Sequence, residues 1–202
     1  DTVTYTLAGV NNTETGWGLK GETWLAMESL KKLGGETWFN LGDRDLATHL
    51  YRTGRLSEGA GLKEVTAEIT SSMGIGVNLL PMTENRVETM VTLLESENEV
   101  SFQEYFVKYR HDVAISSVRF NGSKEAKATP GVIDVINKAE IVIIAPSNPL
   151  VSIAPIFSVP EISKAIKARK KDTVAVSPIV AGAAIKGRAD RLLKDLGHEA
   201  SV

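Results

Sequence analysis

Four ionisable side chains lie close together in the stretch "LGDRDLATHL": Asp43, Arg44, Asp45 and His49. Asp43 and Asp45 are typical cap and dipole residues of a helix N-terminus, but that role leaves Arg44 and His49 unexplained. His49 lies one turn beyond Asp45, so a helix would place both on the same side. A lone histidine most often makes an ordinary structural hydrogen bond, and the pattern alone leaves both interpretations open.

A second polar segment follows an apolar run in "EIVIIAPSNPLVSIAPIF". Pro146 and Pro149 fix their own φ and restrict the residue before each of them, so the loop should be rigid. Ser147 and Asn148 place a hydroxyl and an amide at the end of an expected strand, and Ser152 is a candidate cap for a following helix. The segment fits either a phosphate-binding loop or a rigid connection with cap residues.

The stretch "SPIVAGAAIKG" carries Ser177, Gly182, Lys186 and Gly187. Glycines let a backbone approach a ligand closely, and a lysine can meet a phosphate as a point charge. The spacing is not that of a P-loop, and a flexible loop is the simpler interpretation of this segment by itself. The chain contains no HExxH, GxSxG, CxxC, GxGxxG or protein-kinase pattern.

Composition narrows the class of protein. The 202 residues carry 23 basic and 25 acidic side chains, which leaves no strong basic field for nucleic acid or an anionic membrane. No apolar run has the length of a transmembrane helix. The chain has no cysteine, which excludes disulfides, thiolate zinc sites and a cysteine nucleophile, and which agrees with a location in the reducing cytoplasm.

The first third of the chain is predicted to be helical. Residues 1–10 fit a strand or a short helix capped by Asp1, and we favour the helix. A helix near residues 22–33 should end at Gly34–Gly35. Its expected inward residues are Trp24, Leu25, Met27, Leu30 and Leu33. "GDRDLATHLYRTG" predicts a helix with Asp43 at the N-cap and Gly54 beyond its end, and "GLKEVTAEITSSMG" predicts another helix.

Residues about 77–121 change to a strand pattern. "VNLLPM", "RVETMVTLLE", "SFQEYFVKYR" and "DVAISSVRFNG" are each expected to form strands of an antiparallel insertion, with a hairpin turn at "ESENE". The last third alternates helices with the apolar runs "IVIIA" and "TVAVS", which predict two buried parallel strands. The predicted fold is therefore a single α/β domain over 1–202, with a Rossmann-like parallel sheet, helices on both faces and a small antiparallel insertion.

Several of these segments occur together and in this order in one protein family. "DTVTYTLAGV", "GWGLKGETW", "TWFNLGDRDLATHL", "FQEYFVKYR", "VIIAPSNPLVSIAPI" and "VSPIVAGAAIKGRAD" resemble the 2-phospho-L-lactate transferase (CofD) family over nearly the whole chain. The resemblance implies a Mg²⁺-dependent reaction. In it, a guanosine diphospho-linked three-carbon acid donates its phospho-acid group to the deazaflavin Fo, a precursor of coenzyme F-420 forms, and GMP leaves.

The resemblance also implies roles for particular residues. Asp1 matches an aspartate that contacts the deazaflavin or lies beside the metal, and it is the catalytic and metal-ligand candidate. Asn40 stands where the family usually has a basic residue that contacts the deazaflavin. The remaining residues expected to bind substrate are Asp43, Arg44, His49, Ser147, Asn148, Pro149, Ser177 and Lys186. Family members carry a glycine-rich loop before this region and a further segment after it, so both ends are expected to be truncated.

Two other functions stay open at this point. A related branch of the superfamily binds nucleotide-like ligands and regulates without known transfer chemistry, and a nucleotide-sugar-type transferase is a third class. The transferred acid is lactate, enolpyruvate or glycerate. Small molecules are the expected partners, with no nucleic acid and no membrane, and homodimers are common in the family.

Overall fold

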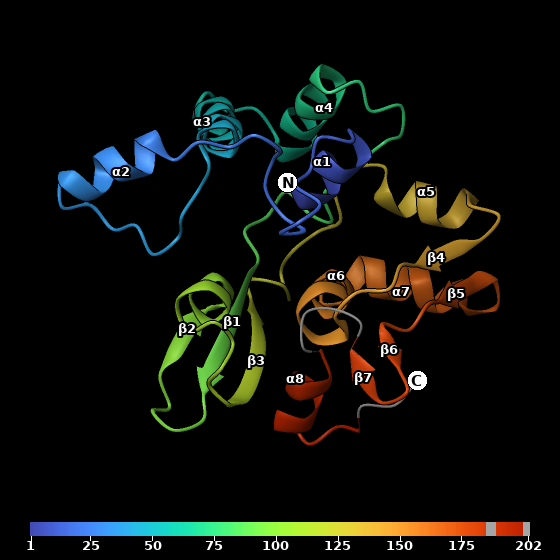
Figure 1. Cartoon of the computed structure of the whole chain (residues 1–202). Helices are drawn as coiled ribbons and strands as arrows, with labels where there is room; N and C mark the ends of the chain where they lie inside the picture. Colours follow the sequence, from blue (N-terminus) through green and yellow to red (C-terminus); the bar gives the residue numbers. More distant parts are fainter. Residues whose placement is uncertain (185–188, 200–202) are drawn as a thin grey trace. The chain divides into compact units, whose positions relative to one another are not determined.

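The computed structural model describes residues 1–184 and 189–199, which form two compact units, Asp1–Pro81 and Met82–Val202 (Figure 1). Unit 1 is helical, and unit 2 combines helices with a parallel sheet and small antiparallel sheets. The predicted α/β class is therefore confirmed. Among the described residues no single helix has the length and apolarity to cross a membrane, although the bent pair Pro149–Phe157 and Pro160–Ala168 passes that test when taken together.

Unit 1 contains four helices: α1 (Thr2–Leu7), α2 (Leu25–Lys32), α3 (Asp43–Ser57) and α4 (Leu62–Ser72). The helix predicted over residues 1–10 is confirmed by α1. Tyr5 of α1 and Val65 and Ile69 of α4 are buried, and these side chains supply much of the apolar interior of this unit. Burial of one apolar stripe per helix is what stabilises helices of this length.

Three details of unit 1 differ from the sequence prediction. Of the residues predicted to face inward, α2 buries Met27, but Leu25 and Leu33 are 65% and 85% exposed, so the prediction is confirmed at Met27 and wrong at these two leucines. α3 continues through Gly54 to Ser57, because one glycine inside a helix costs only about 1 kcal/mol. The N-cap of α3 is Gly42, so the prediction of Asp43 as the N-cap is wrong, and Asp43 is the first residue of the helix.

The N-termini of α2 and α3 cap one another. The Asp43 carboxylate accepts hydrogen bonds from the backbone N–H groups of Leu25 (3.1 Å) and Ala26 (3.0 Å) in α2. In return, the Glu22 carboxylate accepts from the N–H groups of Arg44 (2.9 Å) and Asp45 (3.1 Å) in α3. Each carboxylate satisfies donors that the other helix leaves without an intrahelical partner, and this fixes the start of α3.

The antiparallel sheet of unit 2 has the strand order β2-β1-β3, with β1 at Glu88–Leu93, β2 at Glu99–Ser101 and β3 at Ile115–Asn121. The hairpin turn predicted at "ESENE" joins β1 to β2. Two strand predictions are wrong: no strand forms at "VNLLPM", and "SFQEYFVKYR" gives only the end of β2 before a π-helix, η1 (Glu104–Lys108). Val91, Val100, Tyr105 and Ile115 form the core beside this sheet.

The rest of unit 2 runs α5 (Val132–Lys138), β4 (Val142–Ile144), η2 (Pro149–Ile153), α6 (Ala154–Phe157), α7 (Pro160–Ala168), η3 (Lys170–Asp172), β5 (Thr173–Ala175), β6 (Ile179–Val180), β7 (Ala183–Ala184) and α8 (Ala189–Asp195). β4 and β5 pair in parallel, as predicted, with Ile143 opposite Val174. The prediction that both strands are buried is wrong, since Ile143 is 68% and Val174 54% exposed. β4 and β5 form a sheet of two strands, and the face of this sheet that carries Ile143 and Val174 is not covered by the described residues.

Candidate functional site

Three ligand-type side chains converge in unit 1. The Nε2 atom of His49 lies 3.3 Å from Oδ2 of Asp1 and 3.6 Å from Oδ1 of Asp45, and all three atoms lie within 4.8 Å of one another. Asp45 and His49 are one helical turn apart on α3, as the spacing predicted, while Asp1 comes from the start of α1. The structure thus joins two sequence segments, more than 40 residues apart, that were assigned to the site separately.

A buried tyrosine links the two helices that carry the cluster. The Tyr5 hydroxyl of α1 donates a 2.7 Å hydrogen bond to Oδ1 of Asp45 on α3, and both residues are buried. Burial, together with this bond to a carboxylate, raises the pKa of Tyr5, so the hydroxyl stays protonated and remains a donor at neutral pH. The bond fixes one Asp45 oxygen beside His49 and leaves the rest of that carboxylate for another partner.

Burial also decides the charge of His49. The pKa of His49 is lowered, chiefly because burial disfavours the imidazolium, although the nearby Asp45 carboxylate partly offsets this. The imidazole is therefore neutral at pH 7. Arg52, one turn beyond His49, supplies the neighbouring cation through an ion pair with Asp1.

The cluster borders a cavity of about 440 Å³ within unit 1. Asp1, Thr4, Arg52 and Thr66 are its polar or charged lining residues. The remaining lining residues are apolar: Leu62, Ile69, Leu79, Leu80 and Pro81. The volume is within the range of small-molecule sites, and an apolar lining with a few polar groups is typical of such sites.

Asp43 and Arg44 are placed elsewhere on α3. The Asp43 carboxylate, besides capping α2, accepts a 2.5 Å hydrogen bond from the Thr23 hydroxyl, and this bond is the main reason that the pKa of Asp43 is lowered. The Arg44 guanidinium donates to the backbone carbonyl of Lys20 at 2.5 Å. Both side chains therefore hold the loop before α2 against α3, and the structure does not bring them into the cluster.

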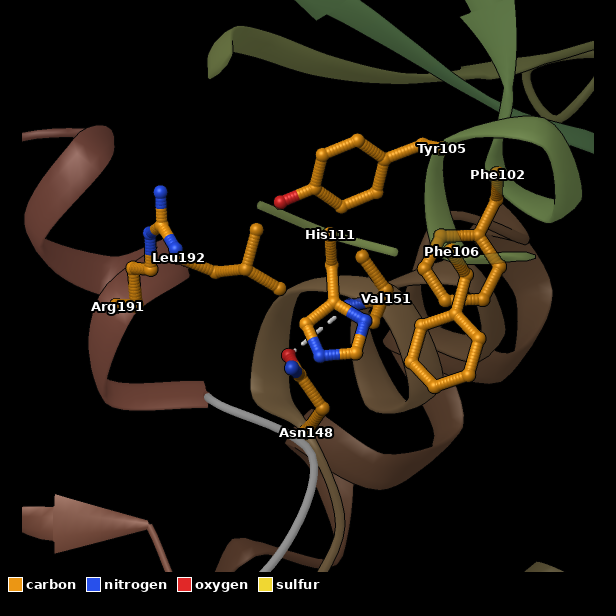
Figure 2. A pocket seen from close by; sticks show the side chains of 8 residues that line it. All are labelled: Phe102, Tyr105, Phe106, His111, Asn148, Val151, Arg191 and Leu192. Atoms are coloured by element: carbon orange, nitrogen blue, oxygen red, sulfur yellow. Dashed lines mark hydrogen bonds between the residues drawn. The ribbon is translucent and has the colours of Figure 1, made fainter. Parts of the chain in front are cut away.

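The predicted residues of the "APSNP" loop lie in unit 2. Figure 2 shows the Asn148 side chain with its oxygen turned to the backbone of Val151. The Oδ1 atom of Asn148 accepts hydrogen bonds from the N–H groups of Leu150 (3.0 Å) and Val151 (3.3 Å) and so caps η2, which begins at Pro149. The cap predicted at Ser152 is wrong, because Asn148 occupies the N-cap position.

Asn148 also lines a small cavity within unit 2 (Figure 2). The cavity measures about 10 Å³ and is shared with His111, whose ring stacks on Phe106 at 4.8 Å between centroids, and with Arg191. That volume holds about one water molecule and no substrate. This cavity is therefore packing space next to the loop, and a substrate contact of Asn148 would use its amide NH₂ group on another side.

The remaining predicted residues are spread over both units. Asn40 lies exposed in the segment between α2 and α3. The Ser177 hydroxyl accepts a 3.0 Å hydrogen bond from the N–H of Ile179 and so stabilises the turn before β6. Ser147 is half-buried at the start of the loop. Lys186 lies outside the described residues.

Two members of the site were not predicted as ligand-binding residues, Asp45 and Arg52. Their spacing from His49 carried a signal, since residues three and four positions apart share one face of a helix. Asp45 belongs to the cluster, whereas Asp43 and Arg44, which the same sequence motif had favoured, contact other parts of unit 1. What the spacing could not reveal is that Asp1 approaches that face.

Comparison with known proteins identifies the family to which the chain belongs. A profile described as "2-phospho-L-lactate transferase CofD" matches residues 1–202. The chain belongs to the CofD family. The resemblance inferred from the motifs is therefore confirmed.

Curated CofD relatives are named phosphoenolpyruvate transferases. Those of Kitasatospora aureofaciens, Mycolicibacterium smegmatis and Streptomyces coelicolor are 42%, 41% and 44% identical, and each alignment covers 100% of this chain. The chain spans 63–64% of the length of these relatives. A crystal structure of a UPF0052-family protein from Bacillus halodurans gives a TM-score of 0.51 at 17% identity, over 82% of this chain and 48% of that one, which shows a shared fold.

Two of the three side chains in the cluster fit Mg²⁺, the metal that the family resemblance implies. Mg²⁺ prefers oxygen ligands and is usually held by one or two carboxylates, waters and substrate phosphates. Asp1 and Asp45 provide two such carboxylates within one cluster. The imidazole of His49 is better suited to transition metals, so we assign it as a close neighbour of the carboxylates and not as a Mg²⁺ ligand. Asp1 and Asp45 are thus the residues that would hold Mg²⁺.

Proposed function

We propose that the full-length protein transfers a phospho-three-carbon-acid group from a guanosine diphospho-linked donor to the deazaflavin Fo, in the biosynthesis of coenzyme F-420. Membership of the CofD family over all 202 residues supports this class of reaction. Relatives at 41–44% identity bear the name phosphoenolpyruvate transferase, and so the enolpyruvate form of the donor is the first candidate among the three acids.

The reaction is a displacement at phosphorus. A ribityl hydroxyl oxygen of Fo forms a bond to the phosphorus that bears the three-carbon acid. The bond from that phosphorus to the bridging oxygen breaks, its electron pair stays on the leaving GMP, and the hydroxyl proton passes to solvent. Such transfers depend mainly on positioning and on neutralising charge, since little other chemistry is required of the protein.

The single observation that carries the assignment is the pair of neighbouring carboxylates, Asp1 and Asp45, of which Asp1 lines the 440 Å³ cavity. Mg²⁺ bound there would neutralise charge on the phosphate oxygens of the donor. Tyr5 orients the Asp45 carboxylate through its hydrogen bond, and His49 lies close to both carboxylates. The apolar lining residues of the cavity, which include Leu62 and Leu80, suit a planar aromatic ring such as that of a deazaflavin.

The test is product analysis by mass spectrometry with the full-length protein, Fo, Mg²⁺ and each of three guanosine donors, which carry lactate, enolpyruvate or glycerate. We expect the phospho-acid adduct of Fo together with GMP, and most rapidly with the enolpyruvate donor. A regulatory protein of the same fold would bind nucleotide but form no adduct and bind no Fo. Adduct formation with none of the donors, in a folded preparation, would contradict the proposal.

A further inference from the structure

Two arginines of α3, one turn apart, differ in what their guanidinium groups contact. Arg55 donates to three carboxylates, at 2.8 Å to Glu58, 3.2 Å to Glu64 and 2.8 Å to Glu68. Within residues 1–184 and 189–199, Arg52 has one ion-pair partner, the Asp1 carboxylate. A guanidinium carries five N–H donors, so most of those on Arg52 are available to a further acceptor.

The position of Arg52 limits which acceptor that is. Its side chain is 23% exposed and lines the 440 Å³ cavity beside Asp1, whereas Arg55 does not line that cavity. A partly buried guanidinium in a ligand-sized cavity is suited to planar, bidentate binding of a phosphate or a carboxylate from the ligand. The Arg52 donors therefore face the space in which a substrate would lie.

The charge of the cluster gives a second reason for this role. Asp1 and Asp45 place two carboxylate groups in the cluster, and Arg52 is the guanidinium that pairs with Asp1 there. An anionic phosphoryl group cannot approach such a site unless cations neutralise it. A metal ion held by Asp1 would weaken the attraction of that carboxylate for Arg52 and would leave the guanidinium available to the incoming phosphate.

We propose that Arg52 is a catalytic residue, which rests on the function proposed above: its guanidinium binds the non-bridging oxygens of the phosphoryl group that is transferred. In the step, the ribityl oxygen forms its bond to phosphorus, the bond to the bridging oxygen breaks, and the electron pair leaves with GMP. Arg52 exchanges no proton and stabilises the charge on the oxygens of the phosphoryl group as it moves.

The experiment compares Arg52→Gln and Arg52→Lys with Arg55→Gln in the full-length protein. For Arg52→Gln we expect kcat to fall at least about 100-fold, with the KM for Fo changed less than about threefold, because the lost contact is strongest in the transition state. Arg52→Lys should recover part of kcat, since it restores charge but not the bidentate fork. Arg55→Gln should lower the melting temperature and leave kcat near that of the wild type.

Direct binding separates this proposal from the proposed function. Inorganic pyrophosphate, titrated calorimetrically in the presence of Mg²⁺, should bind the wild-type protein and bind Arg52→Gln at least about tenfold more weakly. If the wild type makes no Fo adduct, the proposed function fails and this titration alone decides the role of Arg52 as an anion-binding residue. Three results would each overturn the proposed role of Arg52. They are equal pyrophosphate binding by the two proteins, no pyrophosphate binding by the wild type, and a wild-type kcat in Arg52→Gln.

Discussion

The cluster around Asp1 in unit 1 and the Asn148 loop in unit 2 use their polar atoms differently. In the cluster, Asp1, Asp45 and His49 face one another, and Arg52 lies with Asp1 at the edge of a 440 Å³ cavity. In the loop, the Asn148 oxygen accepts two backbone N–H groups, and the adjoining cavity is about 10 Å³.

This contrast shows how a polar motif should be judged. A side chain whose acceptors are taken by its own backbone contributes to local order, while one with unused donors or acceptors beside a cavity can meet a ligand. By this criterion the Asp1 cluster is the stronger candidate for chemistry. In the Asn148 loop, the Asn148 oxygen is used by the cap, and the NH₂ group of its amide is left for a ligand.

The largest expected effect is that of metal removal, which tests the cluster as a whole. We expect the full-length protein to lose Fo-adduct formation in excess EDTA and to regain it with added Mg²⁺, because the carboxylates alone repel the anionic donor. The adduct is quantified by mass spectrometry. Undiminished turnover in excess EDTA would show that the carboxylates act without a divalent cation.

The next effect comes from Asp45→Asn, which removes one charge but keeps an oxygen for the Tyr5 hydroxyl. We expect kcat/KM to fall about 100-fold with little change in melting temperature. Tyr5→Phe is the matched control, since it removes the buried 2.7 Å hydrogen bond but keeps both carboxylates. It should lower stability by about 1.5–3 kcal/mol and lower kcat/KM less than Asp45→Asn does. If the two variants lose activity equally, Asp45 has a structural role only.

Most secondary-structure elements were predicted correctly from the sequence, but the segment at η1 and the burial of several apolar residues were not. Apolar periodicity predicted the helices of unit 1, the β1–β2 hairpin and the parallel pair β4–β5. The segment at η1 was predicted as a strand because it is rich in aromatic residues, although Phe102, Tyr105, Phe106 and Tyr109 have helical spacing. The prediction of which residues are buried failed at more positions, for example at Ile143 and Leu33, which are exposed. Burial depends on which other elements cover a face, and a local sequence pattern does not contain that information.

The site was readable only in part, for a related reason. The face shared by Asp45 and His49 follows from their spacing on one helix, but the approach of Asp1 depends on how α1 packs against α3. The family resemblance identified Asp1 as a site residue but did not predict that Asp45 and Arg52 lie beside it. Asp43 illustrates the limit, because its carboxylate caps a helix that lies earlier in the chain, and no local pattern predicts that contact.

A smaller effect is expected from the Asn148 loop, where two substitutions separate capping from ligand binding. Asn148→Asp keeps the oxygen that caps η2 and loses the NH₂ donor. We expect an unchanged melting temperature and a loss of about 1–3 kcal/mol in kcat/KM for the donor, if that NH₂ group binds it. Asn148→Ala removes the cap as well and should lower stability by a further 0.5–2 kcal/mol or so. Normal donor use by Asn148→Asp would reduce Asn148 to a cap.

The smallest effect is expected at Asn40, in the exposed segment just before α3. An amide can hydrogen-bond a carbonyl or hydroxyl of Fo but brings no charge, and an exposed hydrogen bond contributes only about 0.5–1.5 kcal/mol. Asn40→Ala should therefore weaken Fo binding about two- to tenfold and leave binding of guanosine diphosphate unchanged, as measured by calorimetric titration of each ligand. Asn40→Arg restores the basic residue usual in the family and should tighten Fo binding. Equal losses for both ligands in Asn40→Ala would indicate a folding defect, and unchanged Fo binding in both variants would place Asn40 outside the acceptor site.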